Sequence, residues 1–168
     1  REDLAIARTA FVSTYPPRRC GIATFTSDLS AAARGREIVA LLPPEQTLMY
    51  PPEVHHRIRR DERADYGRTA RALRDCVDVV SIQHEYGIYG GSAGSHILEL
   101  VRDVRMPVVM TCHTILKEPD RDQRRVLATL AACGTGELGH VHYRCAACGQ
   151  RHVVPRSCGN RHCPRCQG

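Results

Sequence analysis

Hydrophobic positions in the first 130 residues alternate between helical spacing and short, mostly apolar runs. Ile22, Phe25 and Leu29 recur at helical spacing, whereas Val77–Ile82 is typical of a buried strand. The predicted helices are Ile22–Arg34, Arg63–Cys76, Ser95–Arg105 and Arg121–Cys133, and Ser95 is the predicted N-cap of the third. The predicted strands are Ala10–Ser13, Glu37–Leu42, Val54–Ile58, Val77–Ile82 and Pro107–Cys112. Strands that alternate with helices predict an α/β fold, with a Rossmann-like parallel sheet and helices on both of its faces.

Polar and glycine-rich residues follow three of the predicted strands. They are Arg18–Gly21 after the first strand, His84-Glu85 with Gly90-Gly91 after the fourth, and His113-Thr114 after the fifth. Ligands of open α/β sheets bind beyond the carboxyl ends of the strands. The pattern therefore predicts an anion or sugar site at this edge, although ordinary turns between strands and helices explain the same glycines equally well.

The composition changes near the end of the chain. The 168 residues carry a net charge of +6 and nine cysteines, and six of the nine lie in residues 133–168 with five arginines and a single acid, Glu137. An odd cysteine count without a visible secretory signal favours metal binding in a reducing cytoplasm over a disulfide framework. No apolar run reaches the roughly 18 residues of a membrane span. We therefore expect a cytoplasmic protein with two regions, 1–130 and 131–168.

The second region has a strong zinc signature. Two C-x2-C pairs, separated by 14 residues, supply four thiolates for one tetrahedral Zn²⁺: Cys145, Cys148, Cys163 and Cys166. Four further residues alternate with these pairs and are candidates for a second site: Cys133, His140, Cys158 and His162. Two sites would give a cross-braced module. The alternative is a single, zinc-ribbon-like site in which the second set has structural roles.

The string Ser-Cys-Gly-Asn-Arg-His-Cys-Pro-Arg-Cys-Gln at residues 157–167 extends this zinc signature. With Leu138–Gly149 it closely resembles the N-terminal zinc-binding domain of rolling-circle insertion-sequence transposases, over about residues 125–168. The resemblance implies contact with transposon-end DNA. Five arginines fit phosphate contact: Arg144, Arg151, Arg156, Arg161 and Arg165. His140-Val141-His142 lies inside the zinc module, so we do not interpret it as the nuclease motif of that family.

Three segments of the first region, Ser13–Phe25, Gln83–Gly91 and Thr111–Thr114, resemble successive motifs of bacterial family 4 glycosyltransferases. This resemblance covers roughly residues 8–130 and implies the acceptor-side half of a GT-B fold. It implies a vestigial sugar or nucleotide-sugar cleft formed by Gly21, His84, Glu85, Gly90, Gly91 and His113. The second Rossmann domain of that family is absent from the sequence, so no catalytic residue is assigned.

These resemblances together indicate a chimera of two truncated genes. The leading hypothesis is a non-enzymatic zinc-binding module that contacts DNA, fused to a catalytically incomplete glycosyltransferase half-domain. One alternative is a glycosyltransferase that acts with a partner supplying the donor domain, and another is a genomic remnant without a selected function. The predicted sheet stops after Val108–Cys112, which should leave an exposed edge of the sheet.

Overall fold

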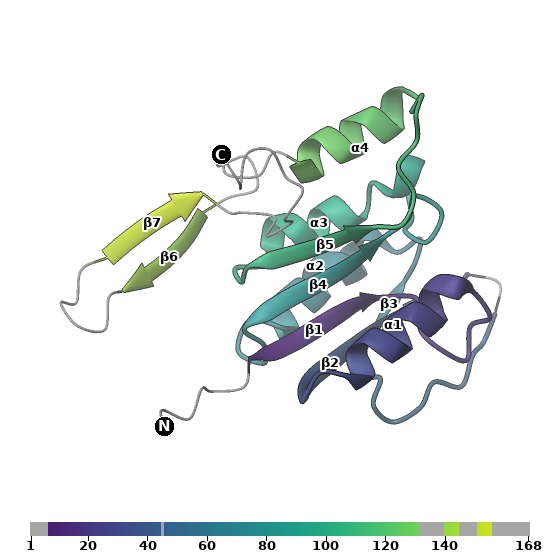
Figure 1. Cartoon of the computed structure of the whole chain (residues 1–168), viewed down its shortest axis with the longest axis horizontal. Coiled ribbons are helices and arrows are strands. Elements are labelled where there is room, and N and C mark those ends of the chain that lie inside the picture. The colour runs from purple at the N-terminus through teal and green to yellow at the C-terminus, as the bar shows by residue number, and fades with distance from the viewer. Residues whose placement is uncertain (1–6, 45, 132–139, 145–150, 156–168) are drawn as a thin grey trace.

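The computed structural model of this chain describes residues 7–44 and 46–131, and it describes residues 140–144 and 151–155 as backbone strands. Residues 7–131, here called the α/β layer, form a parallel sheet flanked by helices (Figure 1). Residues 133–168 are called the cysteine-rich region. Within the described ranges, no helix is long and apolar enough to cross a membrane.

Five strands form one parallel sheet in the α/β layer. They are β1 (Arg8–Ser13), β2 (Gly35–Leu42), β3 (His56–Arg59), β4 (Val79–His84) and β5 (Val108–Cys112). Their order is β3-β2-β1-β4-β5, and every neighbouring pair is parallel. The chain therefore builds outward from β1 through β2 and β3, and then on the other side of β1 through β4 and β5. This confirms the predicted α/β class and places the switch in direction between β1 and β4.

Helices cover both faces of the sheet, as the alternation of patterns predicted. The helical elements are α1 (Gly21–Ala31), α2 (Arg63–Ala72), the short 3-10 helix η1 (Ser92–Gly94), α3 (Ile97–Asp103) and α4 (Arg121–Ala131). Figure 1 shows α1 on one face and α2 and α3 on the other. The amphipathic helix α4 buries Val126 and Leu130 and packs on η1 and α3.

Side chains of β1 and β2 alternate between two hydrophobic clusters, because successive residues of a strand point to opposite faces. In β1, Val12 belongs to the larger cluster beneath α2 and α3, whereas Phe11 belongs to a smaller cluster on the opposite face. The larger cluster includes the fully buried Leu73 and Leu100. Full burial of such a side chain contributes about 1.5–3 kcal/mol. The larger cluster is therefore the main source of stability for the layer.

In the described residues the sheet ends at β5, where the sequence predicted it to stop. β5 stands last in the strand order of the described residues. Val109 in this strand is 39% exposed, and Phe25 and Leu29 of α1 are 43% and 39% exposed. Unpaired backbone groups beside exposed apolar side chains can template pairing with another chain.

The start of α3 differs from the predicted helix at Ser95. Ser95 was expected to cap the helix, but its N–H bonds to the Ser92 carbonyl and closes the 3-10 turn. Ser95 therefore has helical dihedral angles, φ −61° and ψ −19°, instead of the extended conformation of an N-cap residue. His96 precedes α3 and makes no capping bond through its side chain.

Two further strands lie in the cysteine-rich region. β6 (His140–Arg144) and β7 (Arg151–Pro155) pair in antiparallel orientation, with His142 opposite Val153. Along the chain, Cys145 and Cys148 fall in the connection between these strands. The backbone pairing therefore brackets the first C-x2-C pair.

Candidate functional site

The carboxyl ends of β1, β4 and β5 meet beside the switch point of the sheet. They carry Ser13, His84 and Cys112, and the His113 N–H bonds to the His84 carbonyl at 2.9 Å. The structure therefore brings His84, Glu85 and His113 to one end of the sheet, where ligands of open α/β sheets bind.

The loop after β1 is anchored by the N-cap of α1. The Cys20 thiol accepts a hydrogen bond from the Ala23 N–H at 3.4 Å and lies 3.3 Å from the Thr14 hydroxyl. The Thr26 hydroxyl donates to the Ser13 hydroxyl at 2.8 Å. Gly21 begins the helix, and a Cβ added there would meet no atom within 4 Å. The position of Gly21 therefore leaves room beside the helix N-terminus.

His84 is fully buried, and neither ring nitrogen has a hydrogen-bond partner in the part of the chain that the structure describes. Tyr86 and His84 form a T-shaped ring pair at 5.1 Å between centroids, and Tyr89 stacks on His84 at 6.0 Å. Burial lowers the pKa of His84, because the charged imidazolium would lose its hydration. His84 is therefore held neutral between two aromatic rings.

The polar neighbours of His84 are bonded to other protein groups. His113 Nε2 lies 3.0 Å from Gln83 Oε1, and the edge of the His113 ring packs on Phe25. Glu85 accepts bonds from the Tyr86 N–H and the Thr114 hydroxyl. Burial raises the pKa of the Cys112 thiol, which favours the unreactive protonated form. These contacts orient the side chains and brace the end of the sheet.

Gly90 and Gly91 pack against Arg60, Ser95 and His96, and this close packing accounts for both. A Cβ on Gly90 would come within 2.2 Å of the Arg60 carbonyl oxygen. Gly91 has a φ of +77°, a left-handed conformation that disfavours other residues. The cleft role that the glycosyltransferase resemblance implies for these two glycines stays a prediction.

Tyr66, which the sequence pattern did not indicate, has a hydroxyl that joins two segments. It donates to the Arg60 carbonyl at 2.7 Å and accepts from the Gly90 N–H at 3.1 Å. Burial is the main cause that raises the pKa of Tyr66 to about 12, so the hydroxyl keeps its proton. A tyrosine in a helical pattern indicates core packing, and nothing in the spacing reveals the glycine loop as its partner.

The predicted metal ligands fall outside the described side chains. Both sets are in this position: Cys145, Cys148, Cys163 and Cys166, and the alternating Cys133, His140, Cys158 and His162. Of the five predicted DNA-contacting arginines, Arg144 and Arg151 occupy paired backbone positions in β6 and β7. No group of three or more potential ligands in the described part of the chain could hold a metal ion. Both predicted zinc sites therefore stay predictions.

Comparison with known proteins bears on the C-terminal part. Residues 108–168 match the family described as the transposase zinc-binding domain, IS91 type. The curated protein y4qJ of Sinorhizobium fredii (strain NBRC 101917 / NGR234), which is named as a transposase, is 47% identical over 45 residues. The aligned segment covers 27% of this chain and 11% of that protein. No solved structure matches the chain significantly.

These matches confirm the transposase resemblance of the C-terminal part. The family match begins at Val108, so it includes β5 and α4 as well as the cysteine-rich region. Both elements are built into the α/β layer, since β5 pairs with β4 and α4 packs on α3. The family match leaves residues 1–107 outside, and the glycosyltransferase resemblance of that part stays a prediction.

Proposed function

We propose that this chain is a zinc-binding module that contacts DNA and is carried on a non-enzymatic α/β layer. The observation that carries the proposal is the pair of C-x2-C motifs within the range that matches the transposase zinc-binding domain. We do not assign the activity of the whole relative to this chain, because the aligned segment covers only 11% of that protein.

The donor set fits zinc. Four cysteine thiolates in two C-x2-C pairs suit a closed tetrahedral site, with no open position for a catalytic water. β6 and β7 form a sheet of only two strands, and such a hairpin is at best marginally stable by itself in water. Zinc held by Cys145 and Cys148 in the connection between the strands, with Cys163 and Cys166, would supply a cross-link that stabilises it.

The proposed contact with DNA is argued from the positive charge of the cysteine-rich region. The five arginines of the cysteine-rich region face a single acidic residue in the same stretch of sequence, Glu137. Contacts of arginine with phosphate make DNA binding dependent on salt concentration. A zinc ion with four thiolates carries a net negative charge, which offsets part of this excess. We therefore expect modest affinity that weakens as salt is added.

The carboxyl edge of the sheet supports no catalytic assignment. Its histidine, glutamate and thiol groups are buried or bonded to other protein groups, as described for His84, Glu85 and Cys112. We therefore propose a structural role for this edge and assign no glycosyl transfer to it.

Metal content tests the zinc assignment. Elemental analysis of the purified full chain should give zinc, and Cys163→Ser should lower the content. Cys76→Ser is the matched control, because Cys76 carries a free thiol in the α/β layer. Two zinc ions in the wild type and one in Cys158→Ser would support the cross-braced module. One ion in both would leave the single site, and no zinc would refute the proposal.

DNA binding is measured on the same proteins by fluorescence anisotropy with a short duplex. The zinc-loaded chain should bind, and the logarithm of its affinity should fall linearly with the logarithm of salt concentration. Arg161→Gln should weaken binding and reduce the salt slope by about 1. Equal binding by the loaded protein and by a protein stripped of zinc would contradict the DNA role of the module.

A further inference from the structure

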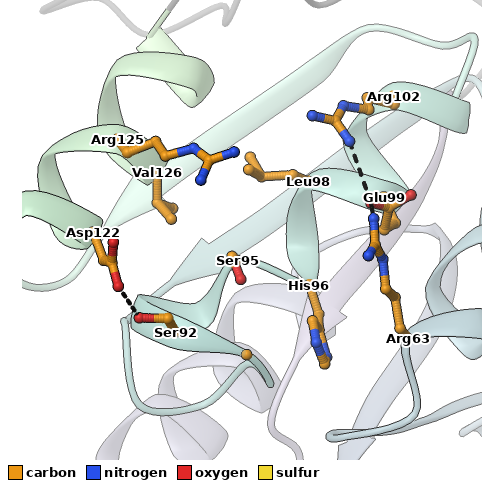
Figure 2. A pocket seen from close by; sticks show the side chains of 11 residues that line it. Arg63, Ser92, Ser95, His96, Leu98, Glu99, Arg102, Asp122, Arg125 and Val126 are labelled. Atoms are coloured by element: carbon orange, nitrogen blue, oxygen red, sulfur yellow. Dashed lines mark hydrogen bonds and ion pairs between the residues drawn. The ribbon is translucent and has the colours of Figure 1, made fainter.

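A hollow of about 340 Å³ lies between α3 and α4, beside η1 and the start of α2. Figure 2 shows charged side chains of three helices converging on it. The polar residues that matter here are Arg63, Ser95, Glu99, Arg102, Asp122 and Arg125. Apart from Gly91, no residue that lines the hollow belongs to the carboxyl edge or to the predicted zinc ligands.

The two carboxylates of the hollow already have partners. Glu99 Oε1 accepts from Arg63 and, at 3.2 Å, from Arg102, so one carboxylate faces two guanidinium groups. Asp122 accepts a hydrogen bond from the Ser92 hydroxyl. Three arginines against two acids leave one excess positive charge. This excess favours an anionic ligand over a cation.

Arg125 supplies the unused hydrogen-bonding capacity. Among the described residues, its guanidinium makes no hydrogen bond or ion pair, and Figure 2 shows it reaching across the hollow toward Leu98. The next residue, Val126, is only 2% exposed and anchors α4 on the layer. The backbone that carries Arg125 is therefore fixed, while its five N–H donors remain available.

We propose that this hollow binds a phosphate group through the Arg125 guanidinium and the Ser95 hydroxyl. A planar guanidinium donates two parallel hydrogen bonds to phosphate oxygens, which a point charge cannot do. Arg63 and Arg102 add positive potential while Glu99 holds them in place. The apolar side chains of the lining are Leu98 and Val126, too few for a predominantly apolar ligand.

The phosphate has two chemical sources, a free phosphorylated compound and a DNA backbone. α4 lies within the range that matches the transposase zinc-binding domain and leads directly into the cysteine-rich region. The family match therefore makes a DNA backbone one of the two sources to be tested. The chemistry at Arg125 is the same for both sources, and the site does not depend on zinc ligands.

Calorimetric titration of the full chain with inorganic phosphate, at constant ionic strength, tests the site. Arg125→Gln should weaken phosphate binding about tenfold, the value of one charge-assisted hydrogen-bonded contact. Arg124→Gln is the matched control, because Arg124 is adjacent but donates to the Pro119 carbonyl and lies outside the lining. Arg125→Lys, which keeps the charge, should fall between wild type and Arg125→Gln.

Absence of phosphate binding by the wild type, or equal losses in Arg124→Gln and Arg125→Gln, would overturn the proposal. A parallel titration with duplex DNA separates the sources. If the bound phosphate belongs to a DNA backbone, Arg125→Gln should weaken duplex binding more than Arg124→Gln does. If the ligand is a free phosphorylated compound, both variants should bind duplex DNA equally, and only Arg125→Gln should lose phosphate binding. Zinc content, which these variants should not change, keeps this test distinct from that of the proposed function.

Discussion

The α/β layer and the cysteine-rich region differ in the interactions available to stabilise a fold. The layer buries a continuous apolar cluster between a five-stranded sheet and its helices. The cysteine-rich region has few large apolar residues, and its two strands cannot enclose a core. In the layer, hydrophobic spacing carries the information for the fold, whereas we propose that in the cysteine-rich region the spacing of the predicted metal ligands carries it.

This contrast predicts that core damage affects only the layer. Leu100 is fully buried in the larger cluster, and Leu100→Ala should reduce the free energy of unfolding by about 2–5 kcal/mol. The measurement is denaturant unfolding followed by circular dichroism. Zinc content should stay at the wild-type value. A matching loss of zinc in Leu100→Ala would show that the two regions fold as one unit.

The second prediction concerns pH and the buried His84. Its pKa in the folded protein is lowered by burial, so the unfolded chain binds the proton more readily. The free energy of unfolding should therefore fall as pH decreases below about 6.5, the ordinary pKa of histidine. Thermal unfolding between neutral and mildly acidic pH measures this.

His84→Phe should remove part of this pH dependence. The half-exposed His55, which lies beside Glu37, provides the matched control as His55→Phe. An unchanged pH profile in His84→Phe would contradict the neutral, buried state of this histidine.

The smallest expected effect concerns the exposed edge strand. Val109 is 39% exposed, so Val109→Lys should cost little stability while it discourages pairing between β5 edges. Light scattering should show less association, with an unfolding temperature close to that of the wild type. Ala128→Lys, an equally charged change at an exposed position of α4, should leave association unchanged. Equal association of the wild type, Val109→Lys and Ala128→Lys would mean that β5 is not the strand through which the chains associate.

Much of the layer was predictable, because its helices and strands obey strong periodicities. All five strands and all four α-helices expected in residues 1–131 are present, with shifted ends. The prediction that Ser95 is the N-cap was wrong, because the positive φ angles of Gly91 and Gly94 allow a 3-10 turn to form before α3. Local sequence does not encode that turn, which also depends on contacts with Arg60 and Tyr66.

The candidate sites were predictable to different degrees. C-x2-C spacing marks the zinc ligands because chelation by neighbouring residues is local in sequence. Grouping of His84 with His113 followed from strand order, which brings β4 and β5 together. The phosphate hollow was missed because Arg63, Arg102 and Arg125 come from three helices. Their convergence depends on how α4 packs on α3.

Amide hydrogen exchange of the full chain, with and without a zinc chelator, tests the central claim most directly. Structural zinc sites couple metal binding to folding, so chelation should remove protection from residues 140–144 and 151–155. Protection in β1, β4 and α3 should be unchanged, because their stability comes from apolar burial. Unchanged exchange in β6 and β7 after complete zinc removal, or loss of protection throughout the layer, would contradict the account.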